Sequence, residues 1–353
     1  MAPAPTPGRG LTRRPLRPPG DSRRRRSPPQ EAVLEKPQAK TRGPSSRPGA
    51  QPQPYAVEFN FGGLDPETSA LAGADAVILP VPYDGTTSYR PGTRFGPHAL
   101  LAASRNMELY DEVLGALYPH GIHTLPELEP VADPEAMVAR VEEAADWVLD
   151  QDKTLITLGG EHSLTTGPVR AYARRHPGLS VLQLDAHGDL RPEYHGTRFS
   201  HACVMSRVRE LVPAVQAGIR SVSEEEAERI TRERLPVFSA RRVKAMAGDY
   251  SPIVDALTDE VYLTVDLDAF DPSECPGVGT PEPGGLGWFD VTEIVAQVAQ
   301  RRRIVGFDLM ELMPLPGDTR AEFLASRLLY RIWGWCLVSR GRHPGPAPGR
   351  PLA

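Results

Sequence analysis

Short apolar runs alternate with amphipathic stretches along most of this sequence. Five runs stop abruptly at polar or glycine-rich residues, and they read AVILPV (76–81), TLITL (154–158), LSVLQL (179–184), VYLTV (261–265) and RIVGFDL (303–309). Continuous apolar runs of this length, rich in β-branched residues, are typical of strands that are buried on both faces. The runs therefore predict the strands of a covered sheet.

Amphipathic helices are expected between these runs. In residues 134–149, four apolar residues recur at steps of three and four, which places them on one face of a helix: Met137, Val141, Ala144 and Val148. This periodicity predicts a helix over the whole segment.

A second helix is expected within FDVTEIVAQVAQ (289–300), where Asp290 and Glu293 have the spacing of a capping box that opens at Asp290. Strand and helix patterns alternate in this way through residues 55–340. The alternation predicts an α/β fold with a mainly parallel sheet covered by helices. Because neither a repeat nor a linker interrupts these residues, we expect a single domain.

Polar and glycine-rich motifs directly follow four of the apolar runs. GGEHS (159–163), DAHGD (185–189), DLDAFDP (266–272) and MEL (310–312) each begin where a run ends. In parallel α/β sheets, ligands bind beyond the carboxyl ends of the strands. We therefore expect these motifs to meet at one edge of the sheet and to form the functional site.

Alternating polar residues in two of the motifs have the spacing of metal ligands. An extended strand points residues i, i+2 and i+4 to the same side, so Asp185, His187 and Asp189 would converge. Alone, this triplet is equally consistent with aspartates that cap turns and a histidine that completes a polar network. Asp266 and Asp268 repeat the spacing after a second run and favour the metal site.

Four carboxylates at one place need countercharge. Without cations they would repel one another and their pKa values would rise, and buried charge of this density is stable only when it is paired. With the histidine of GGEHS, six residues are expected to bind metal: His162, Asp185, His187, Asp189, Asp266 and Asp268.

Two divalent cations would neutralise the four carboxylates. Such ions lower the pKa of a coordinated water toward neutrality and so supply a nucleophile. The ligands are mostly oxygen, with two imidazoles and no thiolate, which favours Mn²⁺ over a zinc site built from Cys and His. Magnesium accepts histidine ligands less readily. The residues therefore favour two manganese ions per chain and leave magnesium as an alternative.

Charge is divided between the start of the chain and the remainder. Residues 1–54 hold twelve Lys or Arg against three Asp or Glu, a net charge of +9, which leaves −14 for the remainder of a chain whose total is −5. They also hold 13 of the 38 prolines, so we expect a disordered basic tail. Its RRRRS run (23–27) could bind nucleic acid by charge, but we interpret the tail as a solvated segment or an extension upstream of the true start. Residues 341–353 are expected to form a loose end.

Membrane and disulfide-rich classes are not indicated. No stretch approaches the ~18 uninterrupted apolar residues of a membrane span, and the nearest, LLYRIWGWCLV (328–338), contains Arg331. Cys203, Cys275 and Cys336 form no CxxC pair, so neither a disulfide framework nor a thiolate zinc site is expected. We interpret Cys203 and Cys275 as buried packing residues and expect a cytoplasmic protein.

Together the motifs resemble those of the ureohydrolases, the family of binuclear manganese enzymes that includes arginases and agmatinases. GGEHS, DAHGD with SHACVM (200–205) downstream, DLDAFDPSECPGVGTPEPGG (266–285) and PYDGTTSYRPGTRFGP (82–97) carry the resemblance, which extends over residues 55–340. It implies an arginase-like three-layer α/β/α fold and a homo-oligomer, commonly a trimer or hexamer. It also assigns the ligands: His162 and Asp189 to one manganese, His187 and Asp268 to the other, with Asp185 and Asp266 bridging.

The reaction implied by the resemblance is hydrolysis of a small cationic guanidino compound to urea and an amine. Asp189 would protonate the leaving amine, and Glu311 would pair with the substrate guanidinium. His201 would shuttle protons, although a histidine that only hydrogen-bonds within its loop has the same signature. Thr280 and Glu193 are expected to line the substrate pocket, where Glu193 would attract a distal ammonium group.

The segment between DAHGD and SHACVM bears on the substrate. Arginases carry an Asn and a Ser-Gly-Asn segment there, whereas LRPEYHGTRFSHA (190–202) lacks that pattern and resembles bacterial agmatinases. Agmatine, cleaved to putrescine in polyamine biosynthesis, is therefore the predicted substrate. Aminopropylagmatine, guanidinobutyrate and arginine stay open, because Arg198 departs from the agmatinase pattern. A catalytically silent protein of this fold and a two-metal hydrolase of phosphate esters or amides also stay open.

Overall fold

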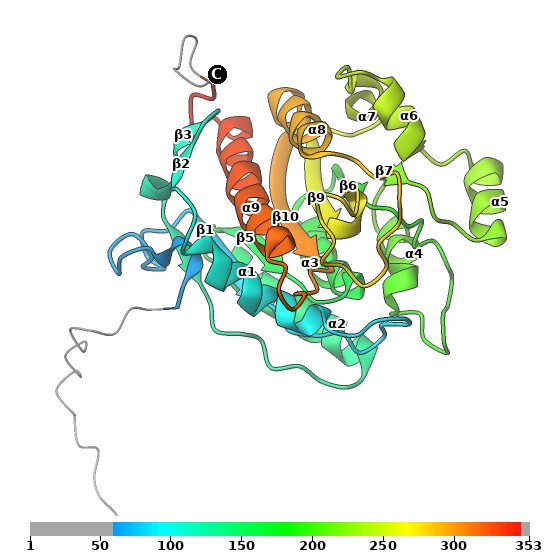
Figure 1. Cartoon of the computed structure of the whole chain (residues 1–353), viewed down its shortest axis with the longest axis horizontal. Helices are drawn as coiled ribbons and strands as arrows, with labels where there is room; N and C mark the ends of the chain where they lie inside the picture. Colours follow the sequence, from blue (N-terminus) through cyan, green and yellow to red (C-terminus); the bar gives the residue numbers. More distant parts are fainter. Residues whose placement is uncertain (1–58, 347–353) are drawn as a thin grey trace, which may run out of the picture. The chain divides into compact units, whose positions relative to one another are not determined.

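A sheet of parallel strands forms the centre of the described part of the chain (Figure 1). The computed structural model describes residues 59–346, so the tail predicted for residues 1–54 lies outside the described residues. Within residues 59–346, eight strands follow the order β4-β1-β5-β10-β9-β6-β7-β8, and all neighbouring pairs are parallel. Their bounds are β1 (Ala76–Pro80), β4 (Ile122–Thr124), β5 (Thr154–Leu158), β6 (Leu179–Leu184), β7 (Ala214–Ile219), β8 (Val237–Ser239), β9 (Glu260–Asp266) and β10 (Arg303–Met310).

All five apolar runs form strands, which confirms the expected mainly parallel sheet. The hydrophobic pattern does not predict β4, β7 or β8. β4 and β8 have three residues each, and β7 carries Gln216 in its middle. Short runs and internal polar residues both weaken the hydrophobic signal.

Helices cover both faces of the sheet, so the fold has the expected three layers (Figure 1). One layer contains α1 (Gly96–Ser104), α6 (Ala240–Ala245), α7 (Ser251–Asp255), α8 (Trp288–Arg301) and α9 (Arg320–Ser339). The other contains α2 (Pro134–Leu149), α3 (Thr166–Arg175) and α4 (Val204–Arg209). Strand residues alternate between the layers: on β1, Ala76 and Ile78 pack into the first core, and Val77 and Leu79 into the second.

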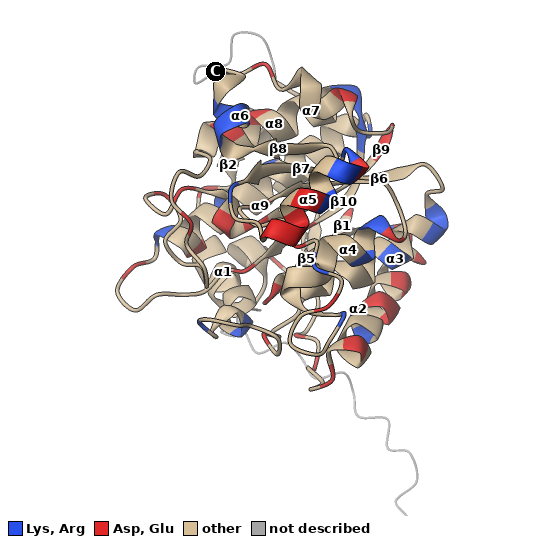
Figure 2. Ribbon diagram, turned by 90° about the vertical axis from the view of Figure 1, so that its right-hand side faces the viewer, with Lys and Arg blue, Asp and Glu red and all other residues tan. Residues whose placement is uncertain are grey.

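The remaining elements lie around these layers. α5 (Glu224–Glu233) packs Ile230 against the second core. The short strands β2 (Tyr110–Asp111) and β3 (Gly115–Ala116) form an antiparallel pair. Ion pairs join α2 and α3 at their exposed edge, where acidic and basic residues face each other (Figure 2); Arg174 contacts Asp146 at 2.6 Å.

Helix starts follow the capping chemistry, but one begins earlier than the sequence pattern indicates. The predicted helix over residues 134–149 is α2, and Asp133 caps it by accepting a hydrogen bond from the N–H of Ala136 at 2.8 Å. α8 begins at Trp288, so Asp290 is its third residue rather than its cap. The Asp290 carboxylate accepts a hydrogen bond from the N–H of Gly287 at 2.9 Å, which is the role of the acidic residue in a capping box.

The most apolar segment of the chain belongs to α9. Residues 328–337 of this helix are buried, and Arg331 pairs there with Asp111 at 2.5 Å. Among the residues that the structure describes, no helix is both long and apolar enough to cross a membrane.

Candidate active site

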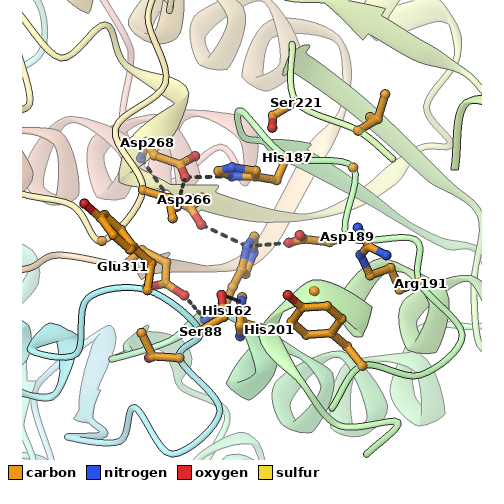
Figure 3. A pocket seen from close by; sticks show the side chains of 18 of the residues that line it. Ser88, His162, His187, Asp189, Arg191, His201, Ser221, Asp266, Asp268 and Glu311 are labelled. Carbon is orange, nitrogen blue, oxygen red and sulfur yellow. Dashed lines mark hydrogen bonds and ion pairs between the residues drawn. The ribbon is translucent and has the colours of Figure 1, made fainter. Parts of the chain in front are cut away.

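The polar motifs meet where four central strands end. β5, β10, β9 and β6 are consecutive in the sheet, and the four motifs begin at their carboxyl ends. His162 begins the 3₁₀ turn η4 (His162–Thr165), and Asp266 ends β9. Five of the six predicted ligands line one cavity of about 260 Å³, while Asp185 is fully buried (Figure 3).

Turns, rather than strand alternation, bring together the ligands that follow β6. β6 ends at Leu184, and Asp189 adopts a φ of +53°. Hydrogen bonds fix the carboxylates instead: Asp185 Oδ2 accepts from Gln183 Nε2 at 2.6 Å, and Asp268 Oδ1 accepts from the N–H of Ala186 at 3.0 Å. The side chains converge as expected, but by a different backbone geometry.

The first group of ligand atoms surrounds His162. Its Nδ1 lies 3.2 Å from Asp266 Oδ2 and 3.4 Å from Asp189 Oδ2 (Figure 3). The same atom lies 3.0 Å from Asp185 Oδ2. His162, Asp185 and Asp266 thus place three candidate ligand atoms within 4.8 Å of one another.

The second group surrounds His187. Its Nδ1 lies 2.9 Å from Asp268 Oδ2 and 3.7 Å from Asp185 Oδ1. Asp185 is therefore common to both groups, one oxygen facing each histidine, whereas Asp266 belongs to the group of His162. The arrangement gives Asp185 the geometry of a bridging carboxylate.

The donor atoms fit divalent cations. The Nδ1 of His162 is buried and has no hydrogen-bond partner among the described residues, although three carboxylate oxygens lie within 3.4 Å of it. Its Nε2 is engaged elsewhere, 2.8 Å from the hydroxyl of Thr264. Nitrogen and oxygen donors that face a common space, without thiolates, are the ligand set that Mn²⁺ accepts.

Burial and mutual repulsion displace the pKa values of this cluster. Burial raises the pKa of Asp189 to about 7, and the charge of Asp185 adds to the effect. Burial and the charge of Asp268 raise the pKa of Asp266 well above its ordinary value. Although burial opposes a charge on His162, the adjacent carboxylates of Asp185, Asp189 and Asp266 hold its pKa well above the usual value. Displaced pKa values of this kind are typical of functional sites.

Comparison with known proteins identifies the family. The sequence profile of the Arginase family matches residues 74–334. The chain belongs to the arginase family. Its motifs, its fold and its paired ligand groups all agree with this membership.

Relatives of this arginase-family chain are ureohydrolases. It is 41% identical over 280 residues to the N(1)-aminopropylagmatine ureohydrolase of Synechocystis sp., covering 76% of this chain and 90% of that one. It is 36% identical over 275 residues to the agmatinase of Pyrococcus horikoshii, covering 76% and 94%. The agmatine ureohydrolase of Thermoplasma volcanium has a similar structure, with a TM-score of 0.72 at 34% identity over 78% of this chain and 95% of that one. The chain is therefore a ureohydrolase, a hydrolase that acts on C–N bonds of amidines.

Glu311 lies on the wall of the cavity, as predicted for this arginase-family site. It follows β10 with a φ of +66°, and its Oε1 accepts a hydrogen bond from the N–H of His162 at 2.7 Å (Figure 3). Burial and the charge of Glu161 raise its pKa well above the ordinary value.

His201 also lines the cavity, at the start of the 3₁₀ turn η5 (His201–Cys203). Its Nδ1 lies 3.2 Å from the hydroxyl of Thr86, and its Nε2 lies 3.4 Å from the hydroxyl of Ser88. Burial, with a contribution from the charge of His187, lowers the pKa of His201 to about 4. The imidazole is therefore neutral at neutral pH.

Thr280 lines the cavity, with its hydroxyl 3.5 Å from Asp268 Oδ2. Glu193 does not line it, contrary to the expectation. The loop turns so that Tyr194 faces the cavity, whereas Glu193 is exposed and borders a separate pocket beside α4 and α5. Arg198 points away as well, since it pairs with Glu210 at 2.7 Å.

The sequence patterns predict no role for four polar residues near the site: Thr86 and Glu161, which lie inside the quoted motifs, and Thr264 and Asp308. Glu161 is fully buried and accepts hydrogen bonds at 2.6 Å from both the N–H and the hydroxyl of Thr86, and burial raises its pKa to about 7. Thr264 and Asp308 lie inside runs that the hydrophobic pattern assigns to strands. A polar side chain in such a run needs a buried partner. This requirement could have identified Thr264 and Asp308 as candidate functional residues.

Proposed function

We propose that this ureohydrolase removes urea from a guanidinoalkylamine, using two manganese ions held by the six clustered residues. The position of Glu311 supports the proposal most strongly. Its carboxylate shares one cavity with both ligand groups, so a guanidinium paired with Glu311 would lie beside the metal ligands. Manganese, when bound, lowers the pKa of water and so supplies the nucleophile.

Glu311 would hold the substrate. Two contacts fix it: its N–H donates to the carbonyl of Gly160, and its Oε1 accepts from the N–H of His162, both at 2.7 Å. A carboxylate held in this way presents acceptors to two guanidinium N–H groups, a charge-assisted contact that orients as well as binds. Fixing the guanidinium carbon beside the ligand groups provides the proximity that hydrolysis requires.

Asp189 and His201 would move protons. Asp189 lines the cavity with its Oδ2 3.4 Å from His162 Nδ1, where it would accept a proton and return it to the leaving amine. The neutral imidazole of His201 lies at the more exposed side, near Ser88, where it would exchange protons between the cavity and solvent.

The substrate is proposed to be N(1)-aminopropylagmatine or agmatine, which present a guanidinium without an α-carboxylate. The name of the Synechocystis relative and its higher identity favour N(1)-aminopropylagmatine. The name of the Pyrococcus relative favours agmatine, which the sequence pattern also predicts. Residues 190–202 lack the arginase pattern, which argues against arginine. The cytoplasmic location and the trimer or hexamer stay predictions.

A substrate panel tests this proposal. Urea release by the manganese-loaded full chain is measured with N(1)-aminopropylagmatine, agmatine, guanidinobutyrate and arginine. The two amines should exceed arginine in kcat/KM by about 100-fold or more, because residues 190–202 lack the arginase pattern that would bind the α-carboxylate. A higher kcat/KM for arginine would refute the proposal. p-Nitrophenyl phosphate in the same assay detects a two-metal phosphatase, and a protein silent on every compound would be a non-catalytic member.

A further inference from the structure

A buried carboxylate lies behind the metal ligands and outside the cavity. Asp308 is in β10, with no exposed surface. Among residues 59–346 it forms no ion pair with Lys or Arg, and its contacts are instead hydroxyl groups: Tyr262 donates to its Oδ2 at 2.8 Å and Thr165 at 3.0 Å. Thr264, on the neighbouring strand β9, is connected to Asp308 through Thr165, because the hydroxyl oxygens of the two threonines lie 3.2 Å apart. A buried charge without a cation is costly, so its presence calls for an explanation.

The hydroxyl protons fix the direction of these hydrogen bonds. Each hydroxyl carries one proton, and the carboxylate can only accept. Thr165 uses its proton on Asp308, so the Thr264 hydroxyl, 3.2 Å from that of Thr165, donates its own proton to Thr165. A lone pair of the Thr264 oxygen is then left to accept.

That lone pair faces His162. The Thr264 hydroxyl lies 2.8 Å from Nε2, so Nε2 carries a hydrogen and, in the neutral ring, Nδ1 has the lone pair. Nδ1 is the atom that lies within 3.4 Å of three carboxylate oxygens. The hydrogen-bonded series Asp308, Thr165, Thr264 and His162 therefore selects the tautomer and the ring orientation that a metal ligand needs.

We propose that Thr264 and Asp308 are positioning residues, which hold His162 so that Nδ1 faces the metal. The inference rests on the proposed role of His162 as a ligand. Partners that accept the distal N–H of a ligating histidine orient the ring and increase its basicity, and their loss typically weakens metal binding about 10- to 100-fold. If Asp308 only tied β10 to its neighbours, its replacement would change stability and leave the metal affinities alone.

Manganese titration of metal-free full-length protein tests the inference without an activity assay. The free Mn²⁺ signal in electron paramagnetic resonance gives the affinity of each site for wild type, Thr264→Val, Thr264→Ser and Asp308→Asn. Thr264→Val keeps the side-chain shape but removes the hydroxyl that accepts from His162. Thr264→Ser retains that hydroxyl. Thr292→Val is the matched control, because it removes a buried hydroxyl of α8 that bonds to the carbonyl of Trp288.

Thr264→Val and Asp308→Asn should lower the Mn²⁺ affinity of one of the two sites about 10- to 100-fold. Thr264→Ser and Thr292→Val should bind both ions with wild-type affinity. The inference would be overturned if folded Thr264→Val bound Mn²⁺ with the same affinities as wild type. It would also be overturned if Thr292→Val lost as much Mn²⁺ affinity as Thr264→Val. If Asp308→Asn does not fold, the Mn²⁺ affinities of the threonine variants still test the inference. A wild type that binds two ions but releases no urea contradicts the proposed function alone, and one that binds no manganese contradicts both.

Discussion

At the scale of single residues, Glu311 has a conformation that is difficult to explain by stability. A non-glycine residue with a φ of +66° costs roughly 1–2 kcal/mol, and a carboxylate placed beside other acids adds to that cost. Such strain is retained mainly at functional sites. The geometry is therefore consistent with a residue selected to hold a cation.

Glu311→Gln should lower kcat/KM for the guanidino substrate about 10- to 100-fold, because a neutral amide loses the charge-assisted contact. Manganese affinity should stay unchanged. Glu322→Gln, which alters a buried carboxylate of α9, is the control and should leave kcat/KM intact. Urea release by both variants measures the effect, and an unchanged rate in Glu311→Gln would favour a substrate without a guanidinium.

Thr86 should set the orientation of His201. Its hydroxyl donates to Glu161 Oε1 at 2.6 Å, so it accepts from His201 Nδ1 at 3.2 Å and leaves Nε2 as the basic nitrogen. Thr86→Val should lower kcat about 10-fold, a part of what general acid–base catalysis contributes, and change the pH profile of kcat. Thr86→Ser should restore both. If Thr86→Val keeps the wild-type pH profile, His201 does not depend on this contact.

Most residues of the candidate site could be predicted because they belong to polar motifs that follow strands. The six ligands, Glu311, His201 and Thr280 are placed together as expected. Glu193 is not, because the direction of a loop side chain depends on turns that local sequence does not specify. The hydrophobic pattern does not identify Thr264 and Asp308, because their partners His162 and Thr165 lie in the turn η4, far away in the sequence.

At the scale of elements, the central strands are predictable and the outer ones are not. β1, β5, β6, β9 and β10 are continuous apolar runs because helices cover them on both faces. β7 instead contains Gln216, which is buried because it donates to the carbonyl of Gly188 at 2.8 Å. A polar residue satisfied by a distant loop cannot be distinguished from an exposed one by local pattern alone.

Arg220 connects the loops around the second ligand group. Its guanidinium donates to the carbonyls of Asp268 and Glu282 at 2.8 and 2.7 Å, and to those of four other residues. Arg220→Met should lower the free energy of unfolding of the metal-free protein by about 2 kcal/mol or more, because buried carbonyls lose a charged donor. Chemical denaturation measures the change.

Arg303→Met is the matched control for Arg220→Met. Arg303 forms an exposed ion pair with Glu260 at 3.0 Å, at the start of β10 and away from the ligands. Exposed pairs contribute about 0–1 kcal/mol. Equal losses of stability in the two variants would show that Arg220 has no special role in holding the loops.

At the scale of the whole molecule, charge separates the first 54 residues from the remainder. Residues 1–54 carry +9 and the remainder −14, and every proposed site residue lies between residues 86 and 311. Deletion of residues 1–54 should therefore leave kcat/KM for urea release unchanged. The measurement compares the full chain with the shortened one, and a large loss of activity would assign the basic segment a role in catalysis.

The central claim concerns a cluster of acidic side chains that two divalent ions neutralise at the sheet edge. Anomalous diffraction at the manganese absorption edge, from crystals of the metal-loaded protein, tests it most directly. Two peaks per chain should lie on either side of Asp185, one beside His162 and one beside His187. A single peak, or manganese bound away from these two histidines, would contradict the account.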